Sequence, residues 1–216
     1  MLNRKGAGAL LLALAFTLIA SASAHAQDSD APRQGAPSRP EVNHEVSIHL
    51  LVTAEAGEGG ARVPQSLDGV VRQLKASLPP SDYRLAATFI NRVRDGASFE
   101  LKSAGGSALN QPQTPGPPLP TVFQITAGGV KLVDPASAQP SINVNQFRLY
   151  FRMPVQTAAV KTEKGESSYP VVQYEEMGLS TQLSVREGEP TLVGTLNTTR
   201  PGQLFAVVIT VRRAGR

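Results

Sequence analysis

The stretch LSVREGEPTLVGTLNTTRPGQLFAVVITVRR, residues 183–213, decides what kind of fold this chain has. It contains two apolar runs, each preceded by turn residues: Gly188-Glu189-Pro190 before the first and Arg200-Pro201-Gly202 before the second. Gly and Pro favour turns, and Pro190 can begin a strand because its missing N–H removes no ladder hydrogen bond there. We therefore predict a β-meander that ends the fold.

The last run, LFAVVITV at 204–211, is apolar on both faces. A strand of this kind is covered on both sides, and two interpretations account for the cover. In the first, both faces belong to the core of this chain. In the second, the strand provides an interaction surface for another protein, with Leu204, Phe205, Val207 and Ile209 as the candidate residues.

The chain upstream of this stretch also reads mainly as strands, from Tyr83 onward. The dipeptides Asp95-Gly96 and Gly128-Gly129 stand between strand-like runs and predict two β-hairpins. The apolar alternation slips between Val144 and Phe147, which predicts a β-bulge. We expect loops over the Pro/Gly-rich residues 103–120 and the polar residues 158–168.

One strand and one helix are expected before Tyr83. Residues 44–53 alternate well enough for a strand. A helix follows, with Ser66 as the expected N-cap and Pro79-Pro80 as its end. Its apolar residues recur at helical spacing, at Leu67, Val70, Val71, Leu74 and Leu78. The fold class is therefore α+β, with one β-α-β-β unit followed by a β-rich antiparallel sheet or small sandwich.

The N-terminus has the three parts of a secretory signal peptide. Arg4 and Lys5 precede an apolar stretch, and Ala24-His25-Ala26 gives a cleavage pattern, so residues 1–26 are expected to be removed. Residues 27–42 are rich in Pro, Ser and charge, which predicts a disordered tether. A single α+β domain over 43–216 is expected to follow, with 43–103 and 119–213 as possible sub-units. We expect export by the Sec pathway, to the periplasm, the outer membrane or the medium.

Charge and cysteine usage exclude several functions. Without Arg4 and Lys5 the 21 basic residues fall to 19, against 17 acidic ones, which leaves a net charge of +2. That balance is too weak to indicate nucleic-acid binding. The chain has no cysteine, which removes thiol catalysis and Cys-ligated zinc.

No catalytic pattern is found in the sequence after the signal peptide. His44 and His49 are five residues apart in a predicted strand, so they face opposite sides and cannot share a metal; we expect both at an edge or surface. Glu175 and Glu176 are adjacent and point apart, and the GEGG at 57–60 lacks the ending of a phosphate loop. We predict no enzyme, no catalytic, metal or cofactor-binding residue, and no cofactor.

Two other functions stay open. One is a small-ligand-binding protein or enzyme with a pocket between the single helix and the sheet, which Tyr83, Tyr150, Tyr169 and Tyr174 could line. The other is an inhibitor that presents the loop at 104–120.

Residues 179–213 resemble the C-terminal β-element of bacterial secretins, the outer-membrane channels of type II and type III secretion and of type IV pili. The matching run is Ser180–Val185, a turn at 186–189, Thr191–Leu196 and a closing strand at 203–211. The chain departs from the family at Thr195, where the second Gly of a pair is usual, and at Val211, where a Pro usually follows. It is also too short for a full secretin barrel with its ring-forming domains.

The resemblance implies an exported, non-catalytic bacterial envelope protein that acts as a protein–protein interaction or assembly module. It implies partners among envelope, secretion or pilus proteins and allows an oligomer. The weak net charge predicts no nucleic-acid partner. The apolar run near the N-terminus is shorter than the roughly 20 residues that span a bilayer, so we expect no transmembrane helix after signal cleavage.

Overall fold

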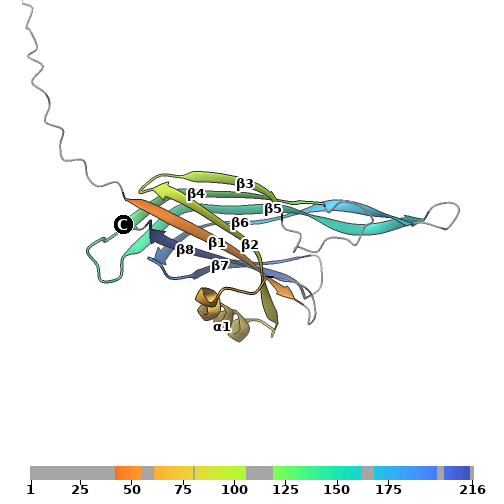
Figure 1. Cartoon of the computed structure of the whole chain (residues 1–216), viewed down its shortest axis with the longest axis horizontal. Coiled ribbons are helices and arrows are strands. Elements are labelled where there is room, and N and C mark those ends of the chain that lie inside the picture. Colours follow the sequence, from red (N-terminus) through yellow and green to blue (C-terminus); the bar gives the residue numbers. More distant parts are fainter. Residues whose placement is uncertain are drawn as a thin grey trace, which may run out of the picture. The chain divides into compact units, whose positions relative to one another are not determined.

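Two antiparallel sheets, each of four strands, make up most of the described chain (Figure 1). The computed structural model describes residues 42–54, 61–79, 81–105, 119–161, 168–198 and 202–214. These residues belong to one unit, Arg39–Arg216. The predicted signal peptide, the tether up to residue 41 and the loop residues 106–118 lie outside the described residues.

Sheet A has the strand order β2-β1-β8-β7, and sheet B has the order β3-β4-β5-β6. The strands of sheet A are β1 (Asn43–Ala54), β2 (Asp82–Arg94), β7 (Thr191–Asn197) and β8 (Leu204–Arg213). The strands of sheet B are β3 (Phe99–Gly105), β4 (Thr121–Val133), β5 (Ser141–Lys161) and β6 (Ser168–Arg186). A 3-10 turn (Gln65–Leu67) leads into the helix α1 (Asp68–Ser77). The α+β prediction with a small sandwich is therefore confirmed.

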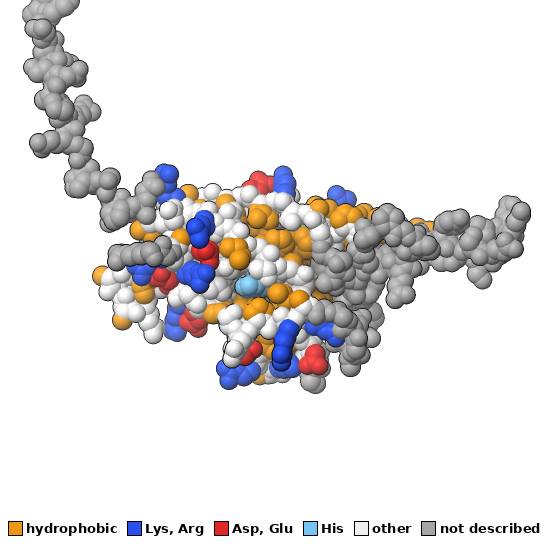
Figure 2. Space-filling model, viewed as in Figure 1, with side chains coloured by type: hydrophobic (Ala, Val, Ile, Leu, Met, Phe, Trp, Pro, Cys, Tyr) orange, Lys and Arg blue, Asp and Glu red, His pale blue; other side chains and the backbone are white. Residues whose placement is uncertain are grey.

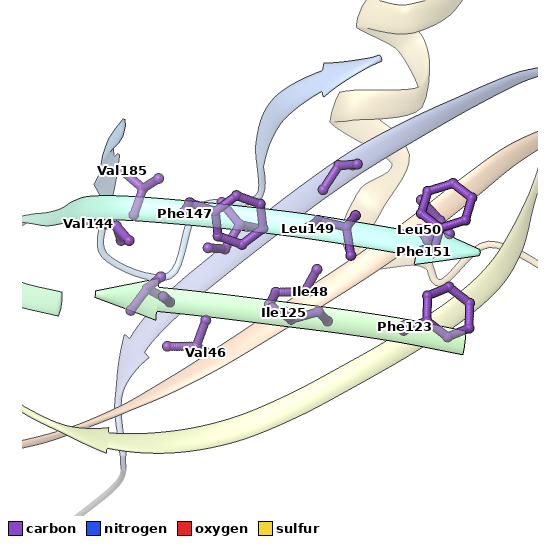
Figure 3. Close-up of a cluster of buried hydrophobic side chains, with 14 of the residues drawn as sticks. Val46, Ile48, Leu50, Phe123, Ile125, Val144, Phe147, Leu149, Phe151 and Val185 are labelled. Atoms are coloured by element: carbon purple, nitrogen blue, oxygen red, sulfur yellow. The ribbon is translucent and has the colours of Figure 1, made fainter. Parts of the chain in front are cut away.

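The main core lies between the two sheets. Alternation along each strand turns every second side chain inward, and Figure 3 shows those of β1, β4 and β5 meeting there. Four phenylalanine rings contact one another in a row through this core: Phe89, Phe123, Phe151 and Phe205. The centroids of successive rings are 5.0, 5.8 and 5.2 Å apart. The core therefore depends on aromatic rings from both sheets.

A second core lies between α1 and the outer face of sheet A. Leu67, Val70 and Leu74 of the helical segment pack there on Leu51, Ala206 and Val208. Helix, sheet A and sheet B therefore form three successive layers. Strand β8 lies in the middle layer, which explains why it is apolar on both faces.

This layering places the predicted interaction surface inside the chain. Phe205, Val207 and Ile209 have 0% exposure and belong to the core between the sheets. Leu204 is partly buried and packs on the helix cluster. Phe205, Val207 and Ile209 are therefore covered by the chain's own elements, as in the first of the two interpretations of this strand, while Leu204 keeps part of its side chain exposed.

Two predicted connections are wrong because the chain crosses between sheets. Asp95-Gly96 does make a turn, with Gly96 at φ 78°, but β2 and β3 lie in different sheets. The Gly96 N–H donates to the Val130 carbonyl of β4 at 2.7 Å, which carries the chain over to sheet B. The turn after Arg186 likewise crosses from β6 to β7, so the predicted meander is reduced to the β7–β8 hairpin.

The Gly128-Gly129 hairpin is also wrong, since both glycines lie inside β4. The strand pairs with β5 on both sides of them, and Gly129 takes φ 60° opposite Asn145. The bulge between Val144 and Phe147 is confirmed, in the pairing of β5 with β6. The glycines and the bulge thus lie at the same level of sheet B and bend it there.

Two local predictions need smaller corrections. Ser66 lies inside the 3-10 turn, and the N-cap of α1 is Leu67, without a side-chain cap. The loop expected at 158–168 is shorter, because β5 continues to Lys161 and β6 begins at Ser168. No helix within the described ranges combines the length and apolar character needed to cross a membrane.

Candidate functional site

Exposed apolar side chains gather on the outer face of sheet B. Among the described residues, five large hydrophobic side chains are at least 36% exposed, and three of them are Val122 (41%), Tyr150 (40%) and Tyr174 (42%). Their strands alternate so that Phe123, Leu149 and Phe151 point inward and these three point outward. Together with Arg152 they are called the sheet B patch.

The register of sheet B brings the members of the patch together. Val122 of β4 lies opposite Arg152 of β5, and Tyr174 of β6 lies opposite Pro154, two residues further along β5. Tyr150 lies opposite Gly178. The patch therefore joins three neighbouring strands and cannot be recognised from any one of them.

Gly178 leaves room for the ring of Tyr150. A Cβ atom at position 178 would overlap this ring and would lie 2.6 Å from the Leu149 carbonyl oxygen. An aromatic ring from the adjacent strand thus covers the glycine, as often occurs in sheets. This contact holds the exposed ring of Tyr150 against the sheet.

Tyr174 is held at both ends. Its hydroxyl donates to the Pro120 carbonyl at 3.3 Å, and the Arg152 guanidinium lies 5.8 Å from its ring centroid. The Arg152 Nε is also 4.0 Å from a Glu176 carboxylate oxygen. At an exposed site the cation–π contact contributes about 0.5–1 kcal/mol, so Arg152 and Tyr174 share one preferred arrangement.

The strands β5 and β6 continue as a two-stranded arm. Pairing of β5 with β4 ends at Arg152, whereas pairing with β6 continues to Lys161 and Ser168. We call residues 153–161 and 168–175 the β5–β6 arm; Figure 1 shows this pair of strands. The arm carries Tyr174 and the 36% exposed Val171. A two-stranded ribbon is only marginally stable in water, so packing on a third element would stabilise it.

The edge strands β2 and β3 carry further partly exposed apolar residues. Phe89 of β2 and Phe99 and Leu101 of β3 are packed against the main core without being fully buried. Figure 2 shows hydrophobic side chains along the middle of the face on which β2 and β3 lie. The described residues give β2 one strand neighbour, β1, apart from an isolated bridge to Ala61.

The two histidines lie on opposite faces of β1. The prediction that His44 lies at an edge or surface is wrong: His44 is fully buried, because it shares the inward face of β1 with Val46. Its Nε2 donates to Asp95 Oδ1 at 2.8 Å, and the Leu132 N–H donates to the same oxygen at 2.8 Å. His49 is partly buried beside Thr88, and burial lowers its pKa.

Asp95 and Glu187 each tie a sheet crossing to a strand. Burial raises the pKa of Asp95, but hydrogen bonds from the Leu132 N–H and from His44 outweigh it and hold this pKa below its ordinary value. The Arg213 side chain bonded to Glu187 lowers the pKa of Glu187 against a smaller effect of burial. Both carboxylates are therefore committed to structural contacts.

The residues considered for chemistry are separated by the fold. Glu176 lies on the same face as Arg152, and Glu175 lies opposite Met153 on the other face. Tyr83 lies near α1, while Tyr150 and Tyr174 are on sheet B, so these three do not line one pocket; the side chain of Tyr169 is outside the described residues. Within the described ranges, no three His, Cys, Asp or Glu side chains are grouped as metal ligands would be.

Comparisons with known proteins give only distant structural neighbours. No family model and no curated protein matches the chain. A chain of the Klebsiella pneumoniae type II secretion system outer membrane complex of PulD, PulS and PulC HR domain is 9% identical, with a TM-score of 0.37. The secretin domain β-barrel of InvG from the Salmonella SPI-1 injectisome is 11% identical, with 0.33. The V. cholerae type IV competence pilus secretin PilQ is 9% identical, with 0.30.

Each of these matches covers 82% of this chain. The match covers 39% of the Klebsiella chain, 64% of the InvG chain and 58% of the PilQ chain. This chain therefore spans less than two thirds of the length of each. The likeness is a distant structural resemblance to secretin domains.

Proposed function

We propose that this chain is an exported, non-catalytic envelope protein that serves as a protein–protein interaction or assembly module. The observation that carries the proposal is the sheet B patch, where two tyrosines, a valine and an arginine are exposed together on one sheet face. Tyr and Arg are enriched among the residues that dominate binding energy at interfaces. The docking surface is therefore assigned to sheet B in place of the buried side chains of β8.

The partner is a protein surface with apolar side chains and a carboxylate. Val122 and the two tyrosine rings supply apolar area, which association would remove from water. Arg152 lies 4.0 Å from Glu176, a distance at which the pair is weak, so a partner carboxylate can take over the guanidinium. The rings of Tyr150 and Tyr174 are already held by Gly178 and Arg152, which reduces the entropy lost on binding.

The β5–β6 arm extends the same surface. It carries Tyr174 and, among the described residues, its two strands pair with no third strand. A partner that packs on the arm would stabilise it and would bury Val171 as well. Export by the Sec pathway and partners among secretion or pilus proteins stay predictions of this proposal.

The test is site-specific photo-cross-linking in the producing cells. A photoreactive residue at Val122 reports on the sheet B patch, and one at Ile90, which is 61% exposed on sheet A, is the matched control. We expect one discrete cross-linked species from position 122 and none from position 90. Mass spectrometry then identifies the partner.

Affinity for the purified partner should depend on the tyrosines. Tyr150→Ala and Tyr174→Ala are each expected to weaken binding about tenfold or more, which corresponds to about 1.4 kcal/mol. Ile90→Ala should leave the affinity unchanged. Equal cross-linking from both positions, or affinities that ignore both tyrosine changes, would disprove the assignment.

A further inference from the structure

Strand β6 forms one edge of sheet B and carries a long uncharged stretch (Figure 1). Among the described residues it pairs with β5 alone, so its other side presents backbone N–H and C=O groups to a further strand. Residues 177–185 contain no charged residue and no proline. At both register shifts of the β5–β6 pairing the extra residue lies on β5, so β6 stays regular through this stretch. A regular, uncharged edge is open to pairing with another strand.

The edge strands β2, β3 and β7 are protected against such pairing. β3, at the opposite edge of sheet B, carries Glu100 and Lys102 within seven residues. In sheet A, β2 carries Arg92 and Arg94, and β7 has a bulge at Val193 in its pairing with β8. Charged side chains and bulges are features by which edge strands avoid association. Residues 177–185 of β6 have neither.

The side chains of residues 177–185 alternate between the two faces of sheet B. Three apolar side chains point toward the main core without being fully buried: Met177, Leu179 and Leu183. Three polar side chains are exposed on the outer face: Ser180, Gln182 and Ser184. An added strand must keep this alternation, because a shift by one residue would turn its apolar side chains to the wrong face.

The stretch is complementary to itself in one antiparallel register. With Thr181 opposite Thr181 of a second copy, Leu179 lies opposite Leu183 of the second copy on the core side. On the outer face, Ser180 lies opposite Gln182 of the second copy. Apolar side chains thus meet apolar ones, polar side chains meet polar ones, and the partly exposed apolar area at this edge is removed from water.

The same register pairs opposite charges at both ends of the stretch. Glu176 lies opposite Arg186 of the second copy, and by symmetry Arg186 lies opposite Glu176 of the second copy. A shift by two residues in either direction removes both pairs. Opposite charges that face each other across strands stabilise a sheet, so charge complementarity selects this register. The pairing ends there, because the next residues, Glu175 and Glu187, would bring like charges together.

The contacts that Glu176 and Arg186 make within one chain are weak. A Glu176 carboxylate oxygen is 4.0 Å from the Arg152 Nε, and an Arg186 guanidinium nitrogen is 3.6 Å from a Glu189 carboxylate oxygen. The side chains of Glu176 and Arg186 are 68% and 65% exposed. Exposed pairs of this kind contribute little, so both side chains can turn to a second copy.

We propose that two copies of this chain pair antiparallel through residues 176–186 of β6, so that their two sheets B become one continuous sheet. The two-fold axis passes beside Thr181, perpendicular to the sheet, and the outer faces of both sheets B therefore point the same way. Each dimer presents two sheet B patches on one side. Self-association through the β6 edge does not depend on the docking partner of the patch, so it goes beyond the proposed docking function.

A charge exchange tests the proposal by sedimentation equilibrium of the purified chain. We expect a concentration-dependent equilibrium between monomer and dimer. Glu176→Arg and Arg186→Glu each place like charges opposite one another and should weaken the dimer about tenfold. The double variant restores opposite charges between the copies and should recover the dimer. Within one chain it brings like charges toward Arg152 and Glu189, so a recovery comes from the second copy.

Single cysteines test the register, since the chain has no cysteine of its own. Thr181→Cys lies opposite its own counterpart, and directly opposite Cα atoms are about 4.5–5.5 Å apart, within the range of a disulfide. We expect a disulfide-linked dimer of this variant under mild oxidation. Ser184→Cys is exposed but lies opposite Gly178 of the second copy, so it should stay unlinked.

Lys102→Glu is the matched control, because it reverses a charge at the opposite edge of the same sheet. It should leave the dissociation constant of the dimer unchanged, and circular dichroism checks that every variant is folded. The proposal is overturned if the chain stays monomeric at the highest attainable concentration, or if the double variant fails to recover the dimer. It is also overturned if Lys102→Glu weakens association as much as Glu176→Arg, or if Ser184→Cys links as readily as Thr181→Cys.

Discussion

Replacement of Phe205 by alanine tests whether β8 is core or contact surface. The side chain has 0% exposure and lies between the two sheets. Its ring meets the ring of Phe151 edge to face, with centroids 5.2 Å apart and an interplanar angle of 86°. Phe205→Ala therefore removes a ring that joins sheet A to sheet B.

The expected loss is about 4 kcal/mol of unfolding free energy. Truncation of a buried Phe to Ala costs about 3–5 kcal/mol, from lost transfer energy and the cavity left behind. The edge-to-face contact accounts for about 1 kcal/mol of that loss. The total unfolding free energy of a domain is about 5–15 kcal/mol, so this single change should remove a large fraction of it.

Urea unfolding of the purified chain measures the loss. Far-UV circular dichroism and tyrosine fluorescence both report on it, since the chain has four tyrosines and no tryptophan. The midpoint should fall strongly while the slope m, which scales with the surface exposed on unfolding, stays unchanged. Val122→Ala, at a side chain 41% exposed, is the control and should cost about 0.5 kcal/mol or less.

A loss below about 1 kcal/mol for Phe205→Ala, with m unchanged, would refute the placement of this ring in the core. Phe205 would then be a contact residue, as the second interpretation of its sequence has it, and the docking surface would return to β8.

Three further predictions concern acid stability and the glycines of the sheets and helix. The pKa values of Asp95 and Glu187 are lowered in the folded state. Their contacts therefore stabilise the fold fully above the unfolded pKa of about 4, and this stabilisation is lost as the pH falls through the folded pKa values. Asp95→Asn should flatten the decline of unfolding free energy between about pH 5 and 2, and an unchanged slope would contradict this. Gly129→Ala should cost about 1–2 kcal/mol of unfolding free energy, because φ is 60° and the new Cβ would lie 3.1 Å from the Cβ of Asn145. Gly69→Ala in α1 meets nothing within 4 Å and should raise the unfolding free energy by up to about 1 kcal/mol. The urea midpoint should therefore fall for the first variant and rise for the second. Gly178→Ala should displace the Tyr150 ring and, because the new Cβ would lie 2.6 Å from the Leu149 carbonyl oxygen, should also lower the urea midpoint. Cross-linking from position 122 should fall in the folded fraction, and cross-linking at the wild-type level would argue against the role of the Tyr150 ring.

The elements of this fold could be predicted because each depends on a short-range period. In β1 the alternation of Val46, Ile48 and Leu50 reflects one buried face, and the helical spacing of Leu67, Val70 and Leu74 reflects another. The bulge before Phe147 was visible for the same reason, since an inserted residue shifts the alternation locally.

The connections could not be predicted because turn chemistry does not say where the next strand goes. Gly96 and Gly129 both need positive φ, yet one crosses between sheets and the other bends a strand. The choice depends on partners distant in sequence, such as Val130 for Gly96 and Asn145 for Gly129. The candidate surface depends on the tertiary structure in the same way, because only the register places Tyr150 and Tyr174 together with Val122.

By itself, the sequence determined the strand-rich α+β class, the helix that the structure places at Asp68–Ser77 and the doubly covered last strand. These follow from the period of apolar residues, which each segment carries alone. Only the tertiary structure decided that β8 is covered by α1 on one face and by sheet B on the other. It also decided that His44 is buried against Asp95. Finally, it placed the exposed apolar side chains of the sheet B patch on β4, β5 and β6. The physical reason is that burial and exposure depend on which sheets pack together, and that packing is decided by contacts between residues far apart in the chain.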